Sequence, residues 1–163
     1  MEEGRIRFLI RGLVIGFMIG LIISGATAFP LPQETSWLIS VLNIHEGAPG
    51  LAGWLLDVNW ALQQTSREHP VLFYGTDWLA FAHIVIALLF IGPLRDPVRN
   101  VWVIEWGMIA CVAVIPLAVI CGPIRGIPFA WTLIDCSFGV VGIVPLIICR
   151  RLIRQLEQMT TAA

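Results

Sequence analysis

The chain has 163 residues, of which 58% are hydrophobic and 13% are charged, and its formal net charge is −1. Its mean hydropathy of +0.86 excludes an ordinary soluble globular domain, which is about half apolar and a quarter charged. A chain of this length and composition predicts one membrane domain of a few helices over residues 1–163. Nucleic-acid binding is not expected, because the basic residues follow the edges of apolar stretches.

Four apolar stretches are each long enough to cross the roughly 30 Å hydrocarbon layer as a helix. They cover about residues 8–28, 77–94, 101–122 and 128–149. We therefore expect an all-α integral membrane protein built as a four-helix bundle. The first stretch also has the basic start and Ala-x-Ala end of a signal peptide, but its length favours an uncleaved first span.

The ten basic residues are all arginines, and they are distributed unevenly around the four spans. Only Arg67 and Arg125 fall on one side of the four-span arrangement, and the other arginines flank the opposite side. By the positive-inside rule, both termini are predicted to be cytoplasmic.

Residues 30–70, between the first two spans, contain two amphipathic segments that are too polar to span a membrane. Their apolar residues recur at helical spacing, namely Trp37, Leu38, Val41 and Leu42 in the first and Leu51, Trp54, Leu55, Val58 and Leu62 in the second. Asn59 and Gln63 are expected to turn away from the second stripe. The two segments predict an outer helical cap, which either lies on the membrane surface or folds over the bundle.

Two ionisable side chains stand inside the apolar stretches, where a bare charge costs several kcal/mol. His83 lies in the second span and Asp135 in the fourth, at similar predicted depths. In the fourth span Trp131, Asp135, Gly139 and Gly142 share one helix face, so the carboxylate is expected to face the bundle interior. We expect His83 and Asp135 to pair as the polar floor of a pocket in the outer half of the membrane. Such a pair suits proton transfer or a hydrogen bond to a ligand.

Three further residues complete the predicted site. Arg125 and Trp131 are expected at the mouth of the pocket. Glu105, about one turn into the third span, is expected to form a structural ion pair with Arg99, with an N-terminal arginine as the alternative partner.

These residues predict a membrane binding or accessory protein that holds a lipid, a quinone or a partner subunit, with the bilayer or a second copy of the chain as further partners. The alternative is a small redox protein that binds haem b or quinone, although no other span offers a histidine as second axial ligand. A third reading makes the His83–Asp135 pair a hydrogen bond that only fixes helix packing. The four cysteines have no metal-ligand spacing, so no metal site is predicted, and no catalytic residue can be named.

Three segments carry a resemblance to known proteins. Tyr74-Gly75-Thr76-Asp77-Trp78, Gly92-Pro93-Leu94-Arg95-Asp96-Pro97-Val98-Arg99-Asn100 and Trp131-Thr132-Leu133-Ile134-Asp135-Cys136-Ser137-Phe138-Gly139 resemble a group of small bacterial inner-membrane proteins. The resemblance implies a bacterial cytoplasmic-membrane location and carries over no activity or catalytic residue.

Overall fold

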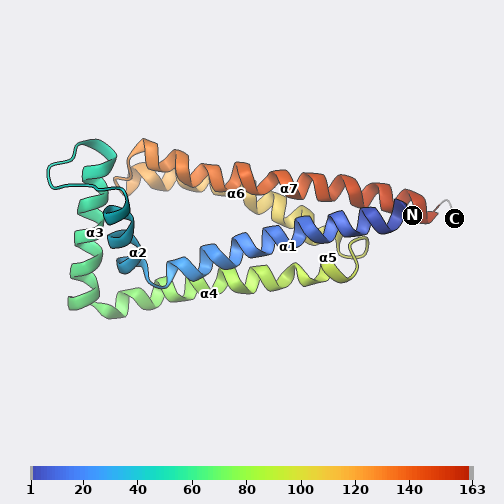
Figure 1. Cartoon of the computed structure of the whole chain (residues 1–163), viewed down its shortest axis with the longest axis horizontal. Helices are drawn as coiled ribbons and strands as arrows, with labels where there is room; N and C mark the ends of the chain where they lie inside the picture. Colours follow the sequence, from blue (N-terminus) through green and yellow to red (C-terminus); the bar gives the residue numbers. More distant parts are fainter. Residues whose placement is uncertain (1, 162–163) are drawn as a thin grey trace. The chain divides into compact units, whose positions relative to one another are not determined.

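The computed structural model describes residues 2–161, and every regular element in that range is helical (Figure 1). The elements are α1 (Glu2–Ala28), α2 (Leu31–Val41), α3 (Gly50–Glu68), the 3₁₀ helix η1 (Pro70–Leu72), α4 (Phe73–Leu89), α5 (Ile91–Arg95), α6 (Val101–Ile124) and α7 (Phe129–Thr161). Four helical stretches are long and apolar enough to cross a membrane, namely Glu3–Ala28, Pro70–Arg95, Val101–Ile124 and Phe129–Met159. The predicted all-α class with four spans and a helical segment between the first two is confirmed, and the chain is a multi-pass membrane protein.

The chain forms two compact units, which are described separately. Unit 1 combines Met1–Gly20 with Ile86–Ala163, and unit 2 consists of Leu21–Val85. Helices α1 and α4 each run from one unit into the other.

Unit 1 contains an extensive contact between α6 and α7, which run in opposite directions. A Cβ atom added to Gly139 of α7 would collide with the backbone carbonyl oxygen of Cys111 in α6. Nearer the connecting turn, a Cβ at Gly122 would lie 2.9 Å from the Thr132 hydroxyl oxygen. Both glycines therefore set the distance between the two helices. The turn itself needs a third, because Gly126 has φ of +69°, a conformation that residues with a Cβ rarely adopt.

The α7 residues that face α6 lie three and four residues apart along one stripe, which we call the α6–α7 seam. Its members are Thr132, Asp135, Gly139, Gly142 and Leu146, and the same stripe continues through the buried residues Cys149, Ile153 and Leu156. This spacing keeps one face of a helix against a neighbour over many turns. The predicted common face of Asp135, Gly139 and Gly142 is thus part of a real helix contact.

The same stripe explains why α7 is longer than the predicted fourth span. The fourth span was expected to end near residue 149, with a tail from Glu157 onward, but the helix continues to Thr161. Ile153 and Leu156 lie beyond the predicted end and are fully buried, so they extend the packing surface. No proline or glycine follows Pro145 to stop the helix.

The rest of the unit 1 core is built around Phe90, which is fully buried. Its ring packs on that of Phe17 from α1, with ring centroids 4.9 Å apart. Gly107 of α6 leaves room for the same ring, since a Cβ there would lie 2.9 Å from the Phe90 Cζ atom. The second span is divided here into α4 and α5, because Pro93 has no N–H to continue the helical hydrogen bonds.

Unit 2 contains the helical hairpin α2–α3, and its contact is polar. The Asn59 side-chain oxygen of α3 accepts hydrogen bonds from the hydroxyls of Thr35 (3.0 Å) and Ser36 (2.8 Å) in α2. The Gln63 amide donates to the Pro32 carbonyl at 2.8 Å and to the Ser36 hydroxyl at 3.0 Å. The prediction that Asn59 and Gln63 turn away from the packing surface is therefore wrong, because their amides satisfy the polar groups of α2.

Replacing Gly139 by alanine tests the close contact of α6 and α7. In an unconstrained helix this change favours the folded state by about 1 kcal/mol. Here the added methyl meets a backbone carbonyl that cannot rotate away, so we expect a net loss of about 1–3 kcal/mol in the free energy of unfolding. Denaturant titration in mixed detergent micelles gives this value. Gly16→Ala is the matched control, since a Cβ at Gly16 meets nothing within 4 Å. Equal stability changes in the two variants would contradict the contact.

Candidate functional site

Asp135 lies in the α6–α7 seam between buried Thr132 and buried Gly139, and is itself half-buried. Across the seam, Gly122 is opposite Thr132 and Cys111 is opposite Gly139. Asp135 therefore lies on α7 between two points where α6 and α7 are in close contact.

Within unit 1, the carboxylate of Asp135 has no hydrogen bond or ion pair with another described residue. An aspartate near the centre of a membrane helix costs about 3 kcal/mol on insertion scales. Ser137, two residues further on, differs in this respect, because its hydroxyl donates to the Ile134 carbonyl at 2.6 Å within the same helix. The described residues of unit 1 thus supply no hydrogen bond that would offset the cost of placing the Asp135 carboxylate inside the span.

His83 belongs to unit 2, where it lies at the contact between α4 and the end of α1. A Cβ at Gly25 of α1 would lie 3.0 Å from the His83 Cβ and 2.7 Å from the Ala80 carbonyl oxygen. The His83 Nδ1 atom is 2.8 Å from the Leu79 carbonyl oxygen. Because a carbonyl only accepts, Nδ1 must carry the proton of this bond, and in the neutral ring Nε2 is then a hydrogen-bond acceptor.

His83 and Asp135 therefore each lie where a glycine lets two helices approach closely, one in each unit. No pattern in the sequence links Gly25 to His83, because α1 also contains Gly4, Gly12, Gly16 and Gly20. The pairing of His83 with Asp135 stays a prediction.

The two residues expected at the mouth of the pocket are both near the start of α7. Arg125 is exposed and ends α6, where its backbone N–H lies 3.0 Å from the Cys121 carbonyl and 3.1 Å from that of Gly122. Trp131 is half-buried in the first turn of α7. Their role at a binding site stays a prediction.

Glu105 forms an ion pair, as expected, but its partner is Arg150 of α7. The Arg150 Nε atom donates to the Glu105 carboxylate at 2.7 Å, and Glu157 lies 4.0 Å from another guanidinium nitrogen. The expected partner, Arg99, instead uses its backbone N–H to bond the Asp96 carboxylate at 3.0 Å in the turn before α6. The antiparallel register brings the start of α6 beside the middle of α7, so Arg150 and not Arg99 lies next to the Glu105 carboxylate.

Arg150 has a further feature that sequence reasoning missed. Its side chain is only 20% exposed, and its Nη1 atom is buried without a hydrogen-bond partner. The signal available beforehand was that Glu105 and Arg150 carry opposite charges at the same predicted membrane boundary.

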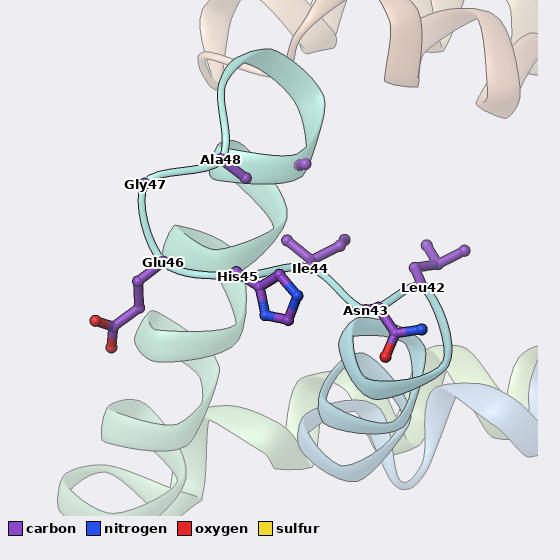
Figure 2. A pocket seen from close by; sticks show the side chains of 8 residues that line it. Leu42, Asn43, Ile44, His45, Glu46, Gly47 and Ala48 are labelled. Atoms are coloured by element: carbon purple, nitrogen blue, oxygen red, sulfur yellow. The ribbon is translucent and has the colours of Figure 1, made fainter.

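Two surface grooves lie in unit 2, and neither is lined by the predicted site residues. The first, of about 480 Å³, follows the loop from Leu42 to Ala48. Figure 2 shows the Glu46 side chain extending away from the His45 ring, so these two groups do not converge on one point. The second groove, of about 610 Å³, runs along α3 beside Trp60 and Gln64. Within residues 2–161, no cluster of three potential metal ligands is found.

Comparisons of the chain with protein-family models, with characterised proteins and with solved structures gave no match.

The Glu105–Arg150 pair can be tested by neutralising one partner. Glu105→Gln leaves a largely buried guanidinium without its carboxylate, so we expect the free energy of unfolding to fall by about 1–2 kcal/mol, between the values for exposed and buried pairs. Glu3→Gln is the control, because Glu3 pairs with Arg7 at 2.9 Å on an exposed helix surface. A double-mutant cycle of Glu105→Gln with Arg150→Gln should give a coupling energy clearly above zero, and zero coupling would argue against the pair.

Proposed function

We propose that the protein is an integral membrane binding or accessory protein whose ligand meets Asp135 in the α6–α7 seam. The observation that carries this proposal is a half-buried carboxylate inside a candidate membrane span, with no hydrogen bond from the described residues of its own unit. An ionisable group in this setting is a functional-site candidate by default.

The chemistry of the two polar residues narrows the class of ligand. An ionised carboxylate only accepts hydrogen bonds, and His83 offers an acceptor at Nε2 when its ring is neutral. Both groups therefore favour a partner with donors, such as a quinol hydroxyl, the ammonium of phosphatidylethanolamine or a polar side chain on the helix of a partner subunit.

We further propose that Arg125 and Trp131 lie at the entrance to this site. Arg125 is an exposed cation at the turn between α6 and α7, close in sequence to the seam. A cation at this position favours ligands with a negatively charged headgroup beside their donor. A zwitterionic lipid satisfies both requirements.

Replacing Asp135 by asparagine tests the proposed site. We expect affinity for phosphatidylethanolamine or for a ubiquinol analogue to fall about tenfold, equivalent to 1.4 kcal/mol. Native mass spectrometry and titration in detergent measure it, and His83→Ala should act in the same direction. Ser137→Ala is the control on the same helix.

If Asp135→Asn and His83→Ala lower thermal stability but leave binding unchanged, the two side chains serve only in packing. A Soret band in the absorption spectrum of the purified protein would favour the haem alternative.

We also propose that the protein lies in a bacterial inner membrane with both termini in the cytoplasm. The uneven arginine distribution supports this orientation. A fluorescent protein fused after residue 163 should therefore fold and fluoresce, and alkaline phosphatase inserted into the loop at residues 43–49 should be active. The reverse result at both positions would invert the orientation.

A further inference from the structure

The α2–α3 hairpin has its polar groups inside and much of its apolar surface outside. Asn59 and Gln63 bind the hydroxyls and a carbonyl of α2 across the hairpin. By contrast, Trp37 is 65% exposed, Val41 55% and Leu42 56%. These three residues form what we call the α2 apolar face. The hairpin buries Leu55, but it leaves these three apolar side chains of α2 exposed.

The connections confine the hairpin to the boundary of the membrane. Only Phe29 and Pro30 separate α1 from α2, so the Cα atoms of Ala28 and Leu31 can be at most about 11 Å apart. At the other end, only His69 separates α3 from the candidate span Pro70–Arg95. Figure 1 shows α2 and α3 running across the ends of α1 and α4 rather than along them. Both helices thus have the direction expected at the headgroup layer.

The second span, which follows α3, also begins with exposed apolar residues. Val71 and Leu72 of η1 are 75% and 63% exposed, and Tyr74 and Trp78 at the start of α4 are exposed as well. Aromatic residues at the start of a span are typical of the membrane interface.

The charges of the hairpin indicate how it meets the bilayer. Between Leu31 and Glu68 there are four acidic residues and one arginine, Arg67, which gives −4 + 1 = −3. Basic residues therefore do not draw this segment to anionic lipids, and burial of apolar side chains must supply the attraction.

We propose that the α2–α3 hairpin lies in the membrane interface with the α2 apolar face inserted among zwitterionic phospholipids. The bilayer then covers Trp37, Val41 and Leu42, while Asp57 and Gln64 of α3 remain in water. This proposal rests on the four spans alone and does not depend on the function proposed for Asp135.

The wild-type chain provides the first test. The protein is reconstituted into phosphatidylcholine vesicles that contain a phosphatidylcholine with a photoactivatable diazirine on its acyl chain. After illumination, peptide mapping should find lipid attached to the segment from Trp37 to Leu42 and not to the polar segment from Gln64 to Glu68. Added salt should leave the pattern unchanged. Absence of lipid on the α2 segment would overturn the proposal.

A second measurement distinguishes lipid from a protein cover. Spin labels are attached to Val41→Cys and, as the control, Gln64→Cys, in a background with the native cysteines replaced by alanine. In the same vesicles, the ratio of collision with oxygen to collision with a water-soluble nickel complex should be several-fold higher at position 41 than at position 64. A label at position 41 that collides mainly with nickel, or that is shielded from both reagents by another protein surface, would contradict the proposal. If the cysteine-free background does not fold, the cross-linking result on the wild-type chain decides.

Discussion

The contact between Gly139 and the Cys111 carbonyl is the constraint from which unit 1 follows. Because α7 has no side chain at this point, α6 and α7 approach to backbone distance and their register is fixed. The register then places Asp135 on α7 between the Gly122–Thr132 and Gly139–Cys111 contacts and, several turns further, brings Arg150 to Glu105 at 2.7 Å. The position of Asp135 in the seam and the Glu105–Arg150 ion pair thus both follow from this one contact between α6 and α7.

The spans could be predicted from the sequence because their lengths and apolar composition are local properties. Their ends could not, since the end of α7 depends on the burial of Ile153 and Leu156, which is a property of the tertiary structure. Similarly, Asn59 and Gln63 were expected to turn away from the apolar stripe of their segment. In the structure, α2 presents two hydroxyls and a carbonyl that only polar partners can satisfy.

For the candidate site, the sequence was sufficient to place Asp135 and Gly139 on one helix face, because helical periodicity is independent of tertiary structure. The sequence also indicated an ion pair for Glu105, but with Arg99 as the partner. Arg99 is close to Glu105 along the chain, whereas the contact with Arg150 depends on the register of two antiparallel helices, which a sequence does not show. The tautomer of His83 was equally inaccessible, since it depends on the orientation of the ring toward the Leu79 carbonyl.

The short link at Phe29 and Pro30 has a mechanical consequence. A span that is longer than the local hydrocarbon thickness tilts, and one that is shorter draws its flanking residues inward. Since α2 follows α1 after two residues and α3 meets the second span after one, a change in the tilt of either span must move the hairpin. A hairpin held at a fixed depth would in turn resist such tilting, so bilayer thickness and the angle of the first two spans are coupled variables in this protein.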